Sequence, residues 1–271
     1  MELSVRRLIS SINYRIIGPL TRQNARNWAS KTDFRKTHRR LLKTLRQSYS
    51  AEEAAKIAVG GEFETVGVLL REALVFHGLK PTDYVIDVGC GSGRLAKPLS
   101  EIQTGKYLGI DVVPGLIDYA RKLVSRSDWR FELANGLTIP EADQTADMVC
   151  FFSVLTHLLH EESFIYLREA RRVLKPGGKI VASFLDFRIP RHWGVFESNI
   201  ADIGVGAQPM NVFMCPEMFR EWARRLELSI EAIHDGDDPY LPLSAPITFE
   251  DGTVMKDRTA FGQSVCVMVR R

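Results

Sequence analysis

From about residue 80 onward, short apolar runs alternate with longer stretches whose apolar residues recur every three or four positions. The apolar runs predict strands beginning at Val85 and over residues 107–111, 129–133, 146–153 and 179–185. The periodic stretches predict helices over 114–124 and 161–174. Residues 146–153 are almost entirely apolar, as expected for a strand that is covered on both faces. Strands alternating with helices indicate an α/β, doubly wound fold around a mostly parallel sheet.

The C-terminal part breaks this alternation. A helix is predicted over 216–226 and strands over 227–234 and 264–269, and only a Pro-, Gly- and Asp-rich loop separates the two strands. Two strands joined without a helix favour an antiparallel hairpin. The sequence therefore predicts a seven-stranded sheet whose edge is an antiparallel hairpin.

Two helices are expected before the first strand. Ser50, followed by Glu52 and Glu53, is typical of a capped helix start, and a second helix is predicted over 63–77. The pair Gly60-Gly61 separates them and lies beside Phe63. We interpret residues 51–80 as lid helices over a cofactor, with Phe63 facing it; an ordinary turn between helices is the alternative.

The first fifty residues differ from the rest of the chain in charge. They contain twelve Lys and Arg against two acids, whereas the remaining residues contain 24 basic and 31 acidic side chains. Leu8, Ile12, Ile16 and Leu20 recur at helical spacing, and a second basic helical stretch is predicted over 33–47. Residues 1–50 are thus predicted to form a basic helical extension. It could pack on the acidic body, bind a membrane surface or another anionic partner, or act as an organelle-targeting peptide. Nucleic-acid binding is the least favoured reading, because aromatic and basic residues do not interleave.

Composition places the remaining 221 residues, 51–271, in one ordinary globular domain. The chain has 271 residues, of which 45% are hydrophobic and 25% charged. Its four cysteines lie far apart, which argues against disulfides and a zinc site and favours a reducing, cytoplasmic location. No apolar run approaches the roughly 20 residues of a membrane span.

A glycine-rich loop follows the first predicted strand. Asp87 precedes Gly89, Gly91 and Gly93, which are spaced two residues apart. Glycines at such points let the backbone turn sharply and let a ligand approach it closely. A dinucleotide fingerprint would require a small residue where Arg94 stands, and a phosphate-binding loop would require Gly-Lys-Ser/Thr. Asp87 could hold the amides of this loop or face a cationic ligand group.

Asp111 ends the next predicted strand, 18 residues after Gly93. A carboxylate accepts hydrogen bonds without donating them, so it can bind both hydroxyls of a ribose. A solvated acid at a strand end is the alternative. The loop and Asp111 together predict a site for a nucleoside-containing ligand.

At this point the chain resembles a known family. The segments 85–93, 109–111, 131–136, 153–157 and 171–178 occur in the order found in class I S-adenosylmethionine-dependent methyltransferases, and the likeness covers about residues 60–185. The resemblance implies that Gly89, Gly91 and Gly93 lie under the methionine and ribose parts of S-adenosylmethionine and that Asp111 binds the ribose. The remaining cofactor-binding residues that it implies are Asp87, Cys90, Arg94, Val112, Asn135, Gly136, Phe152 and Ser153. Asn135 stands where the family often has an acid for the adenine amino group.

Methyl transfer to a hydroxyl also requires a base, and His157, just beyond the fourth strand, is the best-placed candidate. Asp186, at the end of the fifth strand, could contact the substrate. His160 is a weaker candidate base. Both His157 and Asp186 also have ordinary structural explanations, as a packing histidine and a loop-entry acid. Residues 186–215 are expected to form the acceptor pocket, which would be apolar; a plain core is the alternative. The aromatic and methionine side chains concerned are Trp193, Phe196, Met210, Phe213 and Met214.

The function predicted from the sequence is methyl transfer from S-adenosylmethionine to a small-molecule acceptor, most readily a hydroxyl oxygen, without a metal. Three alternatives stay open at this point. They are a nicotinamide-dependent oxidoreductase, a non-catalytic S-adenosylmethionine-binding or interaction module, and an RNA methyltransferase that uses the basic arm.

Overall fold

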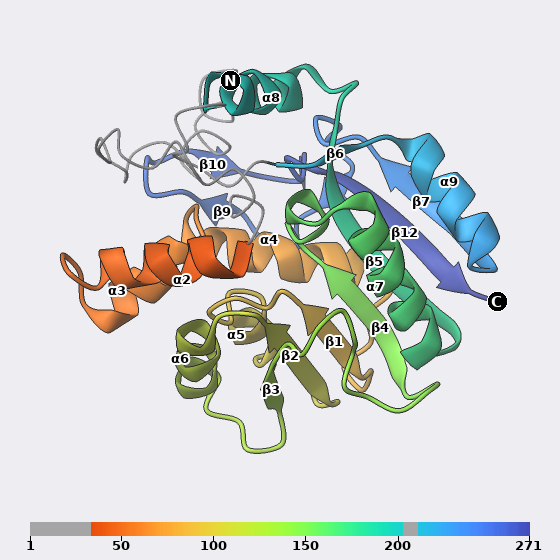
Figure 1. Ribbon diagram of the computed structural model, residues 1–271, viewed down its shortest axis with the longest axis horizontal. Coiled ribbons are helices and arrows are strands. Elements are labelled where there is room, and N and C mark those ends of the chain that lie inside the picture. Colours follow the sequence, from red (N-terminus) through yellow and green to blue (C-terminus); the bar gives the residue numbers. More distant parts are fainter. Residues whose placement is uncertain (1–33, 203–210) are drawn as a thin grey trace.

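The computed structural model describes residues 34–202 and 211–271, which form a mixed α/β fold (Figure 1). Its main sheet has the strand order β3-β2-β1-β4-β5-β12-β7. The strands of this path are β1 (Val85–Val88), β2 (Tyr107–Asp111), β3 (Arg130–Leu133), β4 (Ala146–Phe151), β5 (Leu174–Asp186), β7 (Leu228–His234) and β12 (Ser264–Arg270). The predicted α/β fold with a mostly parallel sheet is confirmed.

Strand direction also follows the prediction. Strands β1 to β5 pair in parallel, and β12 is antiparallel to both of its neighbours, β5 and β7. The carboxyl ends of β1, β2, β4 and β5 therefore meet at one edge of the sheet. An eighth strand, β6 (Phe213–Met214), pairs with the end of β5 at this edge and was not predicted.

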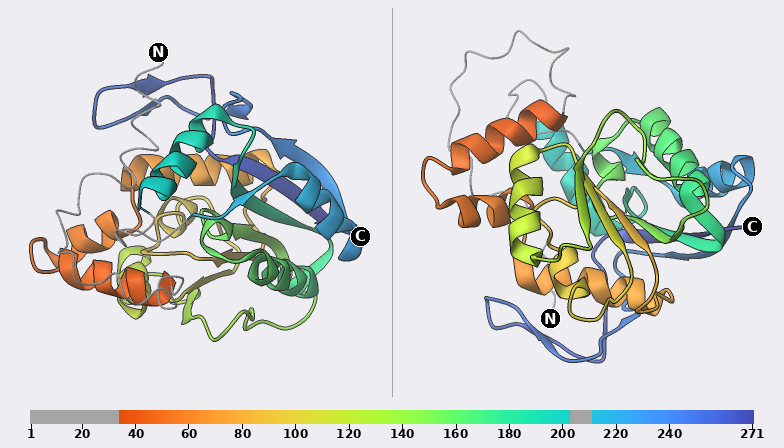
Figure 2. Two further views of the ribbon diagram at one scale, coloured as in Figure 1. Left: turned by 45° about the horizontal axis from the view of Figure 1, so that its top comes forward. Right: turned by 90° about the horizontal axis from the view of Figure 1, so that it is seen from below.

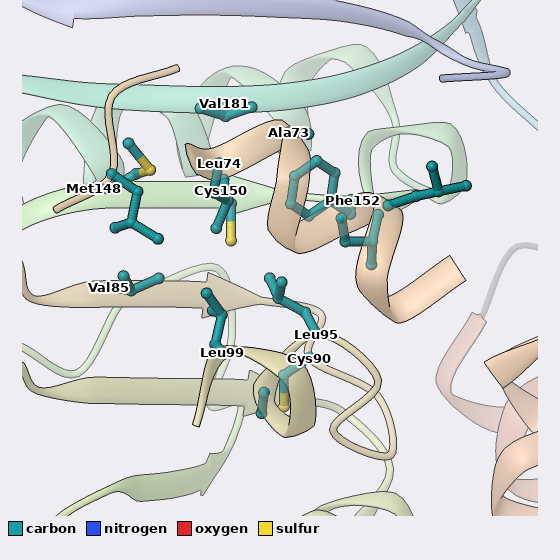
Figure 3. Close-up of a cluster of buried hydrophobic side chains, with 14 of the residues drawn as sticks. Ala73, Leu74, Val85, Cys90, Leu95, Leu99, Met148, Cys150, Phe152 and Val181 are labelled. Carbon is teal, nitrogen blue, oxygen red and sulfur yellow. The ribbon is translucent and has the colours of Figure 1, made fainter. Parts of the chain in front are cut away.

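Helices cover both faces of the sheet. The bounds are α3 (Ala51–Ala58), α4 (Phe63–Phe76), α5 (Ala96–Leu99), α6 (Pro114–Val124), the 3-10 turn η3 (Leu155–His157), α7 (His160–Val173), α8 (Pro190–Asp202) and α9 (Pro216–Arg225). One core lies between the sheet and α4, α5 and α6, where Leu74, Leu99 and Cys150 are fully buried (Figure 3). A second core joins α7 and α9 to the opposite face.

A third apolar cluster attaches the N-terminal helices. Helix α2 (Phe34–Leu45) and α3 lie beside α6 (Figure 2). Leu42, Leu45 and Ala55 pack there in one cluster with Val113 and Leu116 at the start of α6. The predicted cap of α3 is present, because Ser50 and Glu53 each bond to the other's backbone N–H. The helical pattern predicted around Leu8 to Leu20 lies outside the described residues.

Three segments contain structure that was not predicted. Helix α7 ends at Val173 and β5 begins at Leu174, so residues 175–178, between the predicted helix and the predicted strand, belong to an irregular start of β5; Gly177 has a φ of +79° there. Residues 190–202, within the segment expected to form the acceptor pocket, form helix α8. The predicted loop before β12 contains two short antiparallel ladders, β8–β11 and β9–β10. Their strands are β8 (Leu241–Pro242), β9 (Ile247–Thr248), β10 (Val254–Met255) and β11 (Arg258–Thr259).

Candidate cofactor site

The glycine loop leaves β1 and is tied to the end of β2. Gly89, Gly91 and Gly93 have φ values of +78°, +55° and +84°, a region that side-chain-bearing residues rarely adopt. The backbone N–H groups of Gly89 and Cys90 both donate to the carbonyl of Ile110, at 2.7 and 3.0 Å. These positions therefore require glycine for the shape of the loop, independently of any ligand.

Neighbouring side chains lie close to this loop. A Cβ atom added to Gly89 would lie 2.3 Å from Cγ2 of Val154, and one added to Gly91 would lie 2.7 Å from Cγ1 of Val59. Val154 follows β4, and Val59 ends helix α3. The loop is thus enclosed by the end of β4 on one side and by the N-terminal helices on the other.

Asp111 joins the loop to β2 through its side chain. Its Oδ2 accepts the N–H of Gly91 at 3.0 Å, and its Oδ1 accepts the N–H of Val113 at 2.8 Å. Burial raises the pKa of Asp111 to about 6, although these backbone donors oppose the shift. Each carboxylate oxygen can accept a further hydrogen bond, so Asp111 can bind two adjacent hydroxyls while it holds the loop.

Asp87 and Arg94 lie on either side of the glycines. Oδ2 of Asp87 accepts the Tyr107 hydroxyl at 2.7 Å, and burial raises the pKa of Asp87 to about 6. The Arg94 guanidinium donates to the carbonyls of Val59 and Gly60 at 3.3 and 2.6 Å. Burial lowers its pKa to about 10. Arg94 therefore fastens the α3–α4 turn to the glycine loop.

The loop after β3 passes close to Asp111. The N–H of Ala134 donates to the carbonyl of Asp111 at 2.8 Å. The next two residues, Asn135 and Gly136, are exposed. The Tyr166 hydroxyl donates to the carbonyl of Gly136 at 3.2 Å. Asn135 therefore directly follows the residue whose N–H contacts Asp111, the proposed ribose-binding acid, at the same edge of the sheet.

The end of β4 adopts a strained turn. Phe152 is buried, and Ser153 has a φ of +58°, which is unfavourable for a residue with a side chain. The N–H of Ser153 donates to Oγ of Ser183 on β5 at 2.8 Å. Sequence reasoning singled out Phe152 and Ser153 but missed Ser183, because a serine within an apolar strand carries no recognisable motif.

The comparisons with known proteins agree with this geometry. A methyltransferase domain family matches residues 86–182. The chain is 30% identical over 181 residues to the malonyl-(acyl-carrier protein) O-methyltransferase of Hahella chejuensis, covering 65% of this chain and 61% of that protein. It is 28% identical over 141 residues to the demethylmenaquinone methyltransferase of Symbiobacterium thermophilum, covering 46% of this chain and 55% of that protein.

Solved structures show the same fold. The magnesium protoporphyrin IX methyltransferase of Synechocystis with bound SAH has a TM-score of 0.57 at 17% identity, over 89% of this chain and all of that chain. A methyltransferase from Methanosarcina mazei has a TM-score of 0.55 at 14% identity, over 73% of this chain and 96% of that chain. Residues 86–182 of this chain therefore match a methyltransferase domain family, and its fold is that of S-adenosylmethionine-dependent methyltransferases. The chain spans 55% and 61% of the length of these two curated relatives.

The residues present fit S-adenosylmethionine, the cofactor of this family. Asp111 has accepting capacity left beside the glycine loop, as a ribose requires. Among residues 34–202 and 211–271, no group of three or more His, Cys, Asp or Glu side chains is placed to hold a metal ion. In the same part of the chain, no helix has both the length and the apolar character needed to cross a membrane.

The two candidate catalytic residues have different surroundings. His157 ends η3, its ring centroid lies 6.1 Å from that of His38 on α2, and burial, with His38, lowers its pKa to about 3. Asp186 is fully buried at the end of β5, and its oxygens accept hydrogen bonds from the backbone N–H and guanidinium of Arg188. The Asp186 carboxylate is thus occupied by Arg188.

His192, on α8, contacts two other parts of the chain. Its Nδ1 accepts the N–H of Asp186 at 2.9 Å, and its Nε2 lies 2.9 Å from the carbonyl of Gly262, to which it can donate. Both contacts are satisfied by the neutral ring, and burial lowers the pKa of His192. His192 therefore joins α8 to the end of β5 and to the turn before β12.

Aromatic rings gather over the end of β5. Phe187 stacks on Phe213 with ring centroids 4.9 Å apart, and Phe196 lies 5.4 Å from Phe213 and 4.9 Å from Trp193. Phe187 and Trp193 remain 43% and 44% exposed, so this group is not a closed core. Met214 is buried, and Met210 lies outside the described residues.

Proposed function

We propose that this protein is a methyltransferase, that it transfers the methyl group of S-adenosylmethionine to a small-molecule acceptor, and that the acceptor atom is a hydroxyl oxygen. The observation that carries the cofactor half of the proposal is the pair of hydrogen bonds from Gly91 and Val113 to Asp111. They place a carboxylate with remaining acceptor capacity directly beside the glycine loop. The apolar rings beside the end of β5 support a partly apolar acceptor.

S-adenosylmethionine, when bound, supplies a methyl carbon that is already reactive because it is attached to a sulfonium. Held at Asp111 and the glycine loop, it would supply this carbon to the acceptor oxygen, and the carbon–sulfur bond would break with its electron pair left on sulfur. The protein contributes alignment and exclusion of water. The acceptor hydroxyl must also lose its proton.

We propose His157 as the residue that accepts this proton. Its imidazole is neutral at ordinary pH because burial holds its pKa well below neutrality. Asp186 is less suited, since Arg188 already engages both of its oxygens. We propose that Asp186 instead shapes the acceptor side through Arg188 and the backbone bond to His192.

The names of the relatives suggest the acceptors to test. One relative acts on malonyl-(acyl-carrier protein) and one on demethylmenaquinone. The purified protein would be incubated with methyl-tritiated S-adenosylmethionine and, separately, with a soluble naphthoquinol, a malonyl thioester, an alkylamine and mixed RNA. Label on a hydroxyl oxygen of the naphthoquinol supports the proposal, whereas label on the carboxylate of the malonyl thioester would contradict a hydroxyl acceptor. Label confined to the amine or the RNA, or turnover in none of the four arms by protein that binds the donor, contradicts it.

A further inference from the structure

Three polar side chains from distant parts of the chain form a closed set at the end of β4. Ser153 follows β4, Ser183 lies within β5, and Gln263 immediately precedes β12. Ser183 donates its hydroxyl to Oε1 of Gln263 at 2.7 Å, and Nε2 of Gln263 donates to Oγ of Ser153 at 3.1 Å. The N–H of Ser153 donates back to Oγ of Ser183 at 2.8 Å.

The direction of these hydrogen bonds fixes the role of the Ser153 hydroxyl. Because Gln263 presents an N–H to Ser153, Oγ of Ser153 is an acceptor in this contact and keeps its own hydrogen. No other residue in the described part of the chain accepts that hydrogen. The set therefore presents Ser153 as a hydrogen-bond donor.

Gln263 is itself held firmly. The carbonyl of the preceding Gly262 accepts a hydrogen bond from Nε2 of His192 at 2.9 Å, and the N–H of Gly262 donates to the carbonyl of Gly236 at 3.0 Å. Ser183 is fully buried and has no other partner to exchange for Gln263 among the described residues. These contacts at the sheet edge therefore hold Gln263 in the position in which the Ser153 hydroxyl keeps its hydrogen free to donate.

Ser153 also lies near Gly89, the first glycine of the glycine loop, through its neighbour Val154. Val154, the next residue, packs so closely on Gly89 that an added Cβ there would lie 2.3 Å away. Asp111, the ribose acid, binds Gly91, two residues farther along the loop. A cofactor whose ribose lies at Asp111 and whose chain extends along the loop would bring its amino-acid end toward Gly89 and Ser153.

We propose that Ser153 donates a hydrogen bond to the carboxylate of the methionine part of the cofactor, and that Gln263 is a positioning residue that acts through Ser153. This inference rests on the proposed function, because it requires that S-adenosylmethionine occupies the loop. The backbone strain at Ser153 fits such a role, because strained residues persist only where the surrounding structure holds them, and they cluster at ligand-binding sites.

Two nucleoside ligands separate this role from a purely structural one. S-adenosylhomocysteine contains the amino-acid end with its carboxylate and ammonium, whereas 5′-methylthioadenosine has the same adenosine and thioether without either group. Both would be titrated calorimetrically into the wild-type protein, Ser153→Gly, Gln263→Met and the double variant. Glycine suits the φ of +58° at position 153, so Ser153→Gly removes the hydroxyl without adding strain.

The expected results follow from the loss of one hydrogen bond to a charged group. Ser153→Gly should bind S-adenosylhomocysteine about 10- to 100-fold more weakly and should bind 5′-methylthioadenosine as the wild type does. Gln263→Met should weaken S-adenosylhomocysteine selectively, and it should have no further effect when Ser153 is already glycine. Ser229→Ala, at the start of β7 where Oγ accepts Nε of Arg271, is the matched control and should change neither affinity.

Several outcomes would overturn the inference. One is undiminished binding of S-adenosylhomocysteine by Ser153→Gly. Another is a loss in Gln263→Met that is equal for both ligands or that persists in the double variant, because this would indicate a general disturbance of the fold. Failure of the wild type to bind either nucleoside would overturn the proposed cofactor as well. If the wild type binds both but methylates no acceptor, the proposed catalysis fails while the affinities still decide the role of Ser153.

Discussion

The contact between helix α4 and the glycine loop can be tested by adding a single methyl group. Gly67 lies in the interior of α4, where alanine would ordinarily stabilise the helix by about 1 kcal/mol. Here, however, an added Cβ would lie 2.4 Å from the carbonyl oxygen of Arg94. This oxygen belongs to the backbone at the end of the glycine loop and cannot rotate away as a side chain would.

The two effects oppose each other, and the steric effect should be the larger. Overpacking of a well-packed region costs about 1–3 kcal/mol, so after the helical gain of about 1 kcal/mol Gly67→Ala should lower the free energy of unfolding by up to about 2 kcal/mol. Relief of the contact requires α4 to move away from the Arg94 segment. We therefore also expect weaker binding of S-adenosylhomocysteine by this variant.

Urea denaturation followed by circular dichroism measures the first effect, and calorimetric titration measures the second. Gly194→Ala is a matched control, because Gly194 also lies within a helix, α8, and an added Cβ there meets no atom within 4 Å. That substitution should be neutral or stabilising. If Gly67→Ala were as stable as Gly194→Ala, the close packing of α4 on the loop would be refuted.

Three further outcomes are expected. The affinity for S-adenosylhomocysteine should rise as pH increases through about 6, because proton loss turns Asp111, whose pKa burial raises to about 6, into a pure acceptor for the ribose hydroxyls. Asp111→Asn should bind S-adenosylhomocysteine weakly and lose most of this pH dependence; the part that remains would come from Asp87. An unchanged dependence of affinity on pH would exclude Asp111 from the site. His157→Gln should lower the rate of methyl transfer by about 10²- to 10⁴-fold, and the wild-type His157 ring should show no NMR titration between pH 5 and 8, whereas a titration near 6.5 would contradict its burial. His192→Ala should lower the free energy of unfolding by about 2–4 kcal/mol through two lost hydrogen bonds and a cavity, and an unchanged urea midpoint would show that the turn at Gly262 is held by other contacts.

Much of the sheet could be predicted from the sequence because its signals are local. Apolar runs that are buried on both faces identify parallel strands, and the predicted strand over 107–111 and helix over 114–124 have the same bounds as β2 and α6. The antiparallel direction of β12 followed from the absence of a helix after β7. The cap at Ser50 was also visible, since both of its partners lie within four residues.

Features that depend on contacts between distant residues could not be predicted. The set of Ser153, Ser183 and Gln263 joins residues as many as 110 positions apart, and no spacing rule relates them. The pairing of Asp186 with Arg188 is close in sequence, but only the fold shows that this carboxylate is buried and turned toward the guanidinium.

The N-terminal helices illustrate a partial success. The basic stretch over 33–47 predicted a helix, and α2 covers most of it. Its docking on Val113 and Leu116 could not be read from the sequence, because the apolar residues of α2 form a short stripe that could have bound many surfaces. That residues 51–80 act as a lid remains a prediction. The hydrogen bond from the Arg94 guanidinium to the carbonyl of Gly60 is a contact that would hold such a lid against the glycine loop.

Titration of the purified full chain with S-adenosylmethionine, and in parallel with NAD, tests the central claim most directly. We predict saturable heat at one S-adenosylmethionine site per chain, greatly reduced in Asp111→Asn, and no binding of NAD. Absence of S-adenosylmethionine binding by folded wild-type protein, or saturable binding of NAD that depends on Asp111, would contradict the account.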